Sequence, residues 1–433
     1  MNLELAQLPE RCDVLVVGAG PAGSAAAQLL ARAGRDVVLV DSQAFPRDKV
    51  CGDGLIPDAH RALARLGVLD AVMAEAHSAT TLACISPRAG RVDVPGRLAV
   101  LPRKRLDEII CRAAVAAGAR MFAPARFVAP LREGGAAGRA NVDAATGRVN
   151  VDDETGRVVG ATLRHGGTER TIRARWVVLA TGAQPQATIA AGLCQRRTPS
   201  AIALRGYVEN AAMDARITSL EVVWHRRLAP GYGWIFPCGD GLFNIGVGVA
   251  QGERDAGGGR TTPGRNLREM FAAFLQLYAP ARELVEGGRW QAEAGQELKG
   301  APLRCSLEGA RLEAPGVLVT GEAAGSTYAF TGEGIGKAME TAMLAAEAVL
   351  ASDDDAAVRA DYAARVLALK PRFDVYEKAN RANEHPWLID LLVWSARRSP
   401  RRVQRMAGVL EETHIPTDAV TVRGVLRRLF IWR

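Results

Sequence analysis

Three glycines at a fixed spacing are the first residues in this sequence that indicate a binding site. Gly18, Gly20 and Gly23 follow the apolar run 13–17 and precede a stretch rich in Ala and Leu. In a strand–turn–helix unit the first glycine permits a tight turn, the second lets a pyrophosphate approach the backbone, and the third lets helix and strand pack closely. The helix then directs unpaired N–H groups at the phosphates. The residues expected at this dinucleotide site are Gly18, Ala19, Gly20, Ala22 and Gly23.

A carboxylate stands at the end of the next apolar run. Residues 36–40 are expected to form the second strand, and Asp41 follows them directly. An acid at this position accepts hydrogen bonds from the adenosine ribose. The order of strand, glycine turn, helix, strand and acid favours a bound dinucleotide over the alternative, a glycine-rich turn without a ligand.

Two later segments indicate whether the bound dinucleotide is a flavin or a nicotinamide cofactor. Residues 176–182 (WVVLATG) resemble the second signature of flavoproteins, and residues 316–325 (GVLVTGEAAG) resemble the third. The first resemblance implies that Gly182 lies where a strand returns beside the adenosine end. The second implies that Glu322 contacts the ribityl chain, although it is one methylene longer than the Asp that is usual there. FAD is therefore the expected cofactor.

Further cofactor contacts are expected at two helix starts. Gly332, Gly334 and Ile335 open a helix whose free N–H groups can point at the flavin pyrimidine edge and stabilise negative charge there. Arg103 holds the place of an arginine that lies near the cofactor phosphates in proteins with these signatures.

In this order the motifs resemble the flavoprotein fold of the p-hydroxybenzoate hydroxylase superfamily, and within it the geranylgeranyl reductase family. Residues 49–54 (KVCGDG) are similar to that family's KxCGxG turn, and residues 232–237 (YGWIFP) to its YxWxFP motif. The match runs from residue 12 to about residue 350. It implies an α/β fold (α+β overall): a Rossmann-like FAD-binding domain, an inserted antiparallel-sheet substrate domain and a C-terminal helical segment.

The resemblance implies that Cys51 and Gly52 lie close to the flavin and the substrate. Cys51 then donates a proton or shapes the pocket, and a packed cysteine beside a tight turn is the alternative. Lys49 and Asp53 either contact phosphate or ribityl oxygens or are solvated. These roles are expected only because the residues match the family motif. A single cysteine does not by itself indicate a function, since it has no partner residue at a characteristic spacing.

Three aromatic side chains alternate along the second family motif. Tyr232, Trp234 and Phe236 share one face if the segment is a strand. We expect them to line a long apolar pocket beside the flavin, with Tyr232 also catalytic, and a stripe in a domain core is the alternative.

The resemblance implies a reductase that transfers hydride from reduced flavin N5 to an isolated C=C bond of a prenyl or isoprenoid substrate. The electron donor is expected to be NADPH or reduced ferredoxin. Two other functions stay open: a monooxygenase or halogenase acting on a natural product or aromatic compound, and an electron-transfer flavoprotein that passes electrons to a quinone.

The spacing of apolar residues and the positions of Gly and Pro predict the helices and strands that position these residues. Further helices are expected over 58–66, 105–117, 267–277 and 336–350, and short strands over 80–100 and 199–250. The expected FAD-binding domain comprises 8–80, 99–185 and 298–352, the substrate domain 81–98 and 186–297, and the helical basic region 353–433. The tetrapeptide TGRV, at 146–149 and 155–158, is interpreted as two turn-to-strand transitions.

Composition and charge restrict the classes of protein and of binding partner that are expected. The chain has 433 residues, a net charge of +8 and seven cysteines without CxxC spacing, so we expect neither a metal site nor a disulfide framework. The charge is concentrated in residues 397–433, with nine arginines against three acids. Interleaved with Leu and Trp, these arginines suit an anionic membrane surface better than nucleic acid, with a solvated helix as the alternative.

Neither the N-terminus nor any long uncharged stretch predicts insertion into a membrane. Glu4 and Glu10 stand where a secretory signal would be basic and then apolar, and the uncharged stretch 176–195 contains Gly, Pro and Gln. We therefore expect a cytoplasmic monomer with peripheral membrane contact at most.

Overall fold

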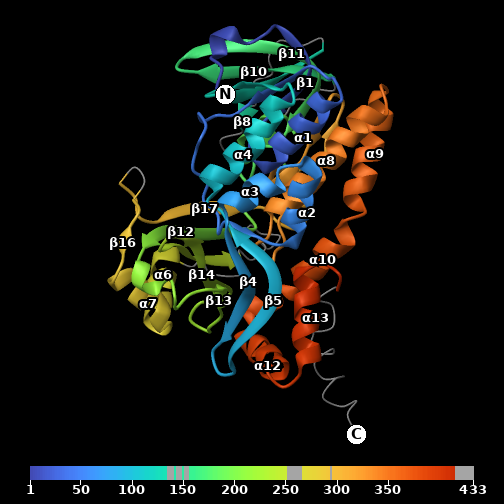
Figure 1. Cartoon of the computed structure of the whole chain (residues 1–433). Coiled ribbons are helices and arrows are strands. Elements are labelled where there is room, and N and C mark those ends of the chain that lie inside the picture. Colours follow the sequence, from blue (N-terminus) through green and yellow to red (C-terminus); the bar gives the residue numbers. More distant parts are fainter. Residues whose placement is uncertain (134–140, 143–148, 151–155, 251–265, 293–294, 415–433) are drawn as a thin grey trace.

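The computed structural model describes the chain except for residues 134–140, 143–148, 151–155, 251–265, 293–294 and 415–433. Among the described residues, eight strands form a first sheet and nine form a second (Figure 1). The expected α/β class, with a C-terminal helical segment, is confirmed.

The first sheet has the order β18-β19-β11-β1-β2-β6, and β10 and β7 extend it from β11. β1 pairs in parallel with both β11 and β2, as a dinucleotide-binding βαβ unit requires. Its strands are β1 (Arg11–Val17), β2 (Val37–Val40), β6 (Arg120–Phe122), β7 (Arg126–Arg132), β10 (Val158–His165), β11 (Thr168–Leu179), β18 (Glu313–Ala314) and β19 (Val317–Val319).

Side chains alternate across β1 and build two cores. Val14 and Val16 pack against α1 and α8, whereas Leu15 and Val17 face β10 and β11. α1 begins at Pro21, a residue suited to a first helical turn, and Gly34, with a φ of 81°, follows its end. The helices around this sheet are α1 (Pro21–Arg32), α2 (Pro57–Leu66), α3 (Leu69–Glu75), α4 (Arg103–Ala116), α5 (Gln186–Ala190) and α8 (Ile335–Ala351).

The second sheet has the order β16-β12-β15-β14-β13-β4-β5-β3, with β17 paired to β12. One of its faces packs against α6 (Leu267–Leu277) and α7 (Ala279–Glu286) around Phe243 and Phe274. Its strands are β3 (Gly54–Leu55), β4 (His77–Ser86), β5 (Gly90–Val100), β12 (Ala201–Glu209), β13 (Leu220–Val223), β14 (Gly231–Gly239), β15 (Leu242–Ala250), β16 (Arg289–Trp290) and β17 (Lys299–Leu303). Strands β8 (Asn141–Val142) and β9 (Val149–Asn150) pair separately.

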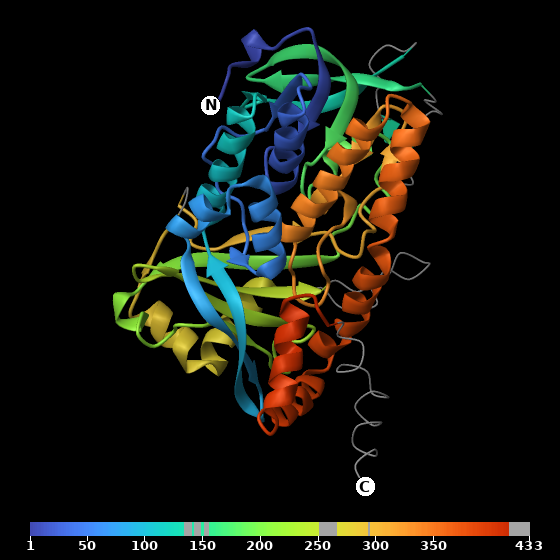
Figure 2. The same ribbon diagram turned by 45° about the vertical axis from the view of Figure 1, so that its right-hand side comes forward.

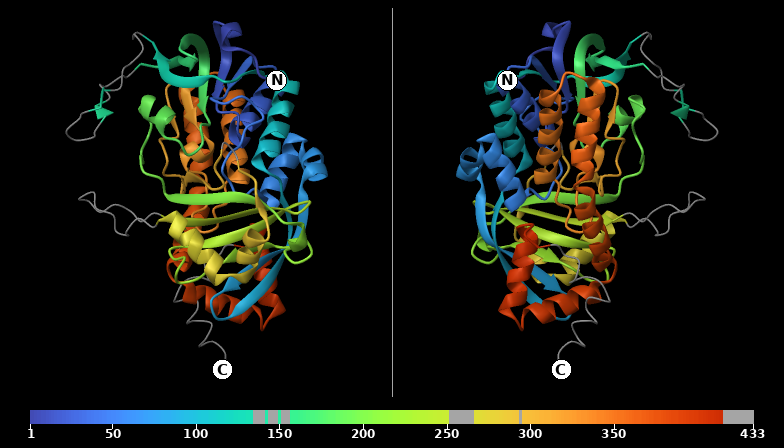
Figure 3. Two further views of the ribbon diagram at one scale, coloured as in Figure 1. Left: turned by 90° about the vertical axis from the view of Figure 1, so that its left-hand side faces the viewer. Right: turned by 90° about the vertical axis from the view of Figure 1, so that its right-hand side faces the viewer.

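The C-terminal helices connect the two sheets. α9 lies beside α8, and the chain then runs to the opposite end of the molecule, where α12 and α13 pack against β4 and β5 (Figures 2 and 3). These helices are α9 (Asp355–Leu367), α10 (Lys370–Ala379), α11 (Arg381–Glu384), α12 (Pro386–Ala396) and α13 (Pro400–Leu410). None of the helices in the described part of the chain has both the length and the apolar character needed to cross a bilayer.

Two strand regions are longer than the sequence indicates. Residues 176–179, in the segment that resembles the second flavoprotein signature, are the end of the twelve-residue strand β11, because the alternating residues before them pair with β10. The short strands predicted over 80–100 are one long hairpin, β4 and β5. Residues 146–148 of the first TGRV copy and residue 155 of the second fall outside the described residues, whereas Val149 begins β9 and Val158 begins β10. The predicted domain boundaries stay a prediction.

Candidate active site

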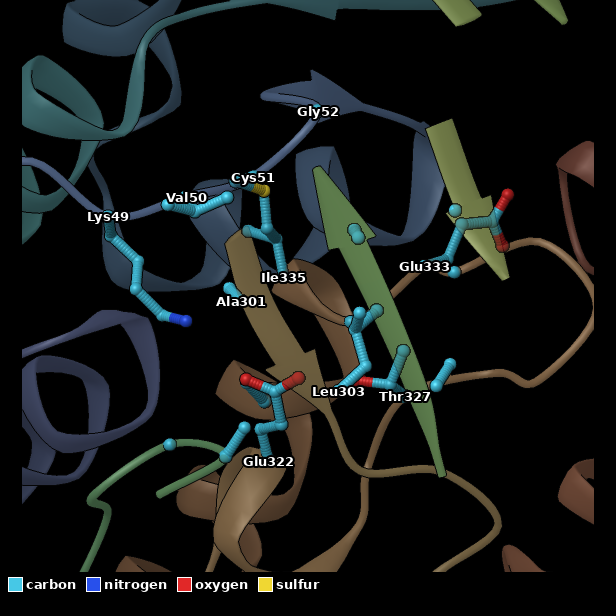
Figure 4. Close-up of a pocket in the computed structure, with 18 of the residues that line it drawn as sticks. Lys49, Val50, Cys51, Gly52, Ala301, Leu303, Glu322, Thr327, Glu333 and Ile335 are labelled. Carbon is cyan, nitrogen blue, oxygen red and sulfur yellow. The ribbon is translucent and has the colours of Figure 1, made fainter. Parts of the chain in front are cut away.

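A cavity of about 1080 Å³ lies between the carboxyl ends of β1, β2 and β11 and the inner face of the second sheet. Its wall includes the glycine turn after β1, residues 47–54, the aromatic face of β14 and side chains of α12 and α13. Figure 4 shows part of this wall: Lys49 and Cys51 come from one turn before β3, Glu322 from the turn after β19, and Thr327 and Glu333 from the segment that leads to α8. The cavity thus collects residues that are far apart in the sequence.

The glycine turn forms a cradle in which Gly18 and Gly23 leave no room for a Cβ. Gly18 has a φ of 100°, and a Cβ on it would lie 2.4 Å from the carbonyl oxygen of Ala180. A Cβ on Gly23 would lie 1.7 Å from the carbonyl oxygen of Gly18. The backbone of the turn, β11 and the start of α1 are therefore in direct contact, as predicted for this fingerprint.

Asp41 secures this turn from the second strand. Its Oδ2 accepts a hydrogen bond from the backbone N–H of Ala19 at 2.9 Å, and its Oδ1 accepts one from Gln43 at 3.0 Å. Asp41 lines the cavity, so the carboxylate lies where a ribose acceptor is predicted while it also fixes the turn.

Two arginines stand beside the second glycine. A Cβ on Gly20 would meet only the side chains of Arg47, at 3.5 Å, Arg103, at 3.8 Å, and Asp107, at 3.9 Å. Arg103 Nε donates to Asp107 Oδ1 at 2.6 Å, and Arg47 Nη1 donates to Asp107 Oδ2 at 2.9 Å. Burial would raise the pKa of Asp107, but Arg103 and Arg47 hold it below its usual range. Two guanidinium groups beside free helix N–H groups suit a pyrophosphate.

The opposite side of the cradle is formed by two turns that contain glycine. Gly182, with a φ of 69°, follows β11, and a Cβ on it would lie 3.9 Å from Glu322 Oε2. Gly332, with a φ of 74°, and Gly334 precede α8, whose first residue is Ile335. All of these residues line the cavity. The predicted cofactor contacts are therefore brought together around one space.

The residues present fit FAD. The buried hydroxyls of Thr181 and Thr331, both in the cavity wall, have no hydrogen-bond partner within the protein. Buried polar groups are normally satisfied, so these two indicate a polar ligand. The glycine cradle and the arginine pair supply the complementary shape and charge.

The turn that contains Cys51 is held by a buried polar network. Asp53 is fully buried with a φ of 63°, and its carboxylate accepts hydrogen bonds from the Tyr207 hydroxyl and, at 2.8 Å, from Asn244 Nδ2. The alternative that Asp53 is solvated is therefore wrong. Burial raises the pKa of Asp53 to about 6, although Arg205 and the two hydrogen bonds act in the opposite direction. Burial also raises the pKa of the Cys51 thiol, so the thiol keeps its proton at neutral pH.

The aromatic face of β14 lies in the cavity wall. Tyr232, Trp234 and Phe236 all line the cavity, and neighbouring ring centroids are 6.4 Å apart. Trp234 fits because Gly246 stands opposite it on β15, where a Cβ would lie 2.4 Å from the indole ring. The Tyr232 hydroxyl donates to the carbonyl oxygen of Thr331 at 2.7 Å, and burial raises its pKa.

Comparison with known proteins adds to this geometry. The family profile described as "FAD binding domain" matches residues 11–240. The menaquinone reductase of Mycolicibacterium smegmatis is 34% identical over 348 residues, which cover 78% of this chain and 76% of that protein. The digeranylgeranylglycerophospholipid reductase of Methanoculleus marisnigri is 29% identical over 348 residues, covering 77% of this chain and 75% of that protein.

This chain belongs to the geranylgeranyl reductase family of FAD-dependent flavoproteins.

Solved structures agree on the fold of this flavoenzyme. A geranylgeranyl bacteriochlorophyll reductase-like protein from Thermoplasma acidophilum superimposes with a TM-score of 0.62 at 21% identity, covering 97% of this chain and 96% of that one. A flavin-dependent brominase superimposes with a TM-score of 0.70 at 17% identity, covering 97% and 98%. At these identities the comparison concerns the fold alone. The family assignment makes the chain an FAD-dependent oxidoreductase.

Sequence reasoning missed four residues in or beside the site of this flavoenzyme. Arg47 belongs to no recognised motif. Glu333 stands between Gly332 and Gly334, but in that motif only the glycines and the helix start were interpreted. Asn244 and Arg205 project from the cavity face of their strands, because they stand in register with Phe236 and Gly246. The alternation of Asn244, Gly246 and Gly248 with apolar residues was the available signal.

Glu333 lies in the cavity wall between the two glycines that precede α8. Burial raises its pKa to about 8, and the nearby carboxylates of Asp58 and Glu412 add to the shift. This side chain is therefore a protonated acid at neutral pH in the folded protein.

Proposed function

We propose that this flavoenzyme reduces isolated C=C bonds in the isoprenoid chain of a lipid, with a prenyl quinone or a prenyl glycerolipid as the substrate class. One observation carries the proposal: the cavity continues from the cofactor cradle to an apolar end lined by Ile389, Leu392, Met406 and Leu410. A long apolar extension suits a prenyl chain rather than a compact aromatic ring. The relatives named menaquinone reductase and digeranylgeranylglycerophospholipid reductase support the same class.

Reduced FAD supplies a hydride when bound. The protein's own contribution is to exclude water and to hold a proton near the reacting carbon. An unactivated alkene gains cationic character as it accepts a proton, so a dry wall of Tyr232, Trp234 and Phe236 prevents its capture by water. Such a wall also orients the flat prenyl units against the cradle.

Two cavity side chains, Cys51 and Tyr232, are candidates for the proton donor. Burial raises the pKa values of both Cys51 and Tyr232, so both are protonated at neutral pH. Cys51 lies in the turn that contacts the aromatic face, since a Cβ on its neighbour Gly52 would lie 3.3 Å from the Phe236 ring. Tyr232 already donates its proton to the Thr331 carbonyl. Cys51 is therefore proposed as the donor and Tyr232 as a positioning group.

The two roles predict different variant behaviour. Cys51→Ala should lower kcat by at least about a hundredfold, as removal of a general acid does, with KM little changed. Tyr232→Phe should raise KM with a smaller effect on kcat. Equal effects of the two variants on kcat contradict the assignment.

The principal test uses the dithionite-reduced enzyme without oxygen. Mixing with menaquinone or geranylgeranyl diphosphate should reoxidise the flavin, and mass spectrometry should show a gain of two hydrogens in the isoprenoid chain. Quinone ring reduction with an unchanged chain identifies an electron-transfer flavoprotein instead. In a separate aerobic assay, oxygen consumption coupled to hydroxylation or halogenation identifies a monooxygenase or halogenase. Either result overturns the proposal.

The electron donor is proposed to be NADPH or reduced ferredoxin. Stopped-flow absorbance of the bound flavin with each donor separates them, because the physiological donor should reduce the flavin at least as fast as turnover.

A further inference from the structure

Helix α12, Pro386–Ala396, is apolar on two sides. Leu388, Ile389 and Val393 are buried in the core that α12 shares with β4 and β5. Ile389 and Leu392 also line the apolar end of the cavity. One side of this helix therefore forms the wall of the proposed substrate site.

The other side carries two exposed tryptophans. Trp387 and Trp394 are seven residues apart, with the half-buried Leu391 between them, so the three share a helix face. The exposed fractions of the tryptophans are 49% and 43%, although large aromatic side chains are usually well covered. A surface helix normally presents polar residues outward, and an aromatic outer face indicates an interaction surface.

Arginines follow this face in the sequence, and one of them contacts it. Residues 386–410 contain five arginines and one acid, Asp390, which accepts hydrogen bonds from the backbone N–H groups of Arg88 and Ala89. The guanidinium of Arg398 lies 4.1 Å from the Trp394 ring centroid. Arg401 and Arg405 of α13 are exposed. Tryptophan beside basic residues is typical of protein surfaces that bind the interface of anionic bilayers.

We propose that the outer face of α12 (Trp387, Leu391 and Trp394), together with Arg398, Arg401 and Arg405, docks on an anionic lipid bilayer. The apolar end of the cavity then lies directly behind the docked helix, where a lipid chain can pass from the bilayer into the site. The identity of that lipid rests on the proposed function, whereas the docking itself does not.

This surface overlaps in part with the one predicted from the sequence, which centred on the basic residues 397–433 and had Leu391 and Trp394 just ahead of it. Within that range Arg397 donates to the carbonyl oxygen of Ala89 at 2.6 Å, and Arg402 donates to Ser395, so both are engaged within the protein. Residues 415–433 lie outside the described part of the chain. Of the six docking residues, Arg398, Arg401 and Arg405 lie within residues 397–433, and the other three belong to α12, which precedes that range.

The test is co-sedimentation of the full-length FAD-loaded enzyme with phosphatidylcholine vesicles containing about a quarter phosphatidylglycerol. Trp387→Ser/Trp394→Ser should weaken binding at least tenfold, and Arg398→Glu/Arg401→Glu/Arg405→Glu should abolish the preference for anionic over neutral vesicles. Matched controls are Leu367→Ser, which changes an apolar side chain of α9 that is 55% exposed, and Arg268→Glu/Arg282→Glu, which reverses charge on α6 and α7. The controls should bind like the wild type.

Equal binding by the tryptophan variant and the Leu367→Ser control overturns the proposal, provided the flavin absorbance shows both to be folded. Dimers in light scattering that the tryptophan changes dissociate assign the face to a second copy, which also overturns it. Turnover of a short-chain substrate in detergent tests the proposed function separately, because it needs no bilayer.

Discussion

The side chain of Asn244 donates a hydrogen bond to the backbone carbonyl of Cys51 at 2.8 Å. The same amide group donates to Asp53, and its oxygen accepts from Trp234 Nε1 at 2.9 Å. One fully buried amide thereby joins the cysteine turn, a buried carboxylate and the aromatic wall. The position of Cys51 relative to that wall depends on Asn244.

Replacing this amide should cost far more than replacing an exposed one. Asn244→Leu leaves Trp234 Nε1 and an oxygen of Asp53 with fewer partners, at about 1–3 kcal/mol for each buried unsatisfied group. Guanidinium denaturation should therefore show a loss of roughly 2–4 kcal/mol in the free energy of unfolding. Asn266→Ala, which removes the exposed cap of α6, should cost about 1 kcal/mol. A smaller loss for Asn244→Leu than for this control contradicts the role assigned to the network.

Two glycines of the fingerprint should respond differently to alanine. Gly20→Ala places its Cβ between Arg47 and Arg103, no closer than 3.5 Å to either, so the protein should fold normally. That methyl group enters the proposed pyrophosphate position, and FAD affinity measured by equilibrium dialysis should fall at least tenfold. Gly23→Ala meets the Gly18 carbonyl at 1.7 Å and should also lower the Tm of the apoprotein. Normal FAD binding by Gly20→Ala places the pyrophosphate elsewhere.

A large residue at the apolar end of the cavity should select against long chains. Leu392→Trp fills the space behind α12, so kcat/KM for a long prenyl substrate should fall at least tenfold relative to that for a short one. Leu367→Trp, on the exposed side of α9, is the control for an added indole. An unchanged ratio of the two kcat/KM values means that the substrate does not reach this end.

The raised pKa of Glu333 makes a prediction about stability and pH. Its pKa is about 8 in the folded protein against an ordinary value of 4.5, so folding takes up a proton between these limits. The stability that depends on this proton is fully present below about pH 4.5 and is lost as the pH rises through 8. Glu333→Gln carries no such proton, and its Tm relative to the wild type should therefore increase with pH over this window.

The size of this effect has an upper limit of about 1.4 kcal/mol per pH unit for one proton. A difference in Tm between Glu333→Gln and the wild type that stays constant from pH 4.5 to 8 means that Glu333 is ionised in the folded state.

The sequence by itself determined the cofactor unit. Gly18, Gly20, Gly23 and Asp41 lie within one local βαβ unit, where the spacing of residues fixes the geometry, and the strand, turn and helix formed as predicted. The alternation of Tyr232, Trp234 and Phe236 likewise determined which face of β14 they share. Such features depend on the period of a strand or a helix and need no information about the rest of the chain.

Only the tertiary structure decided what surrounds these residues. Asn244 donates a hydrogen bond to Cys51, which lies 193 residues earlier in the sequence. This contact depends on the register of β14 and β15 and on the packing of the second sheet on the first. Asp53 is buried rather than solvated because Tyr207 and Asn244 arrive from two neighbouring strands. Likewise α12 closes the cavity because the chain returns past both sheets after α9. Long-range pairing of this kind depends on how whole surfaces fit together, which local periodicity does not encode.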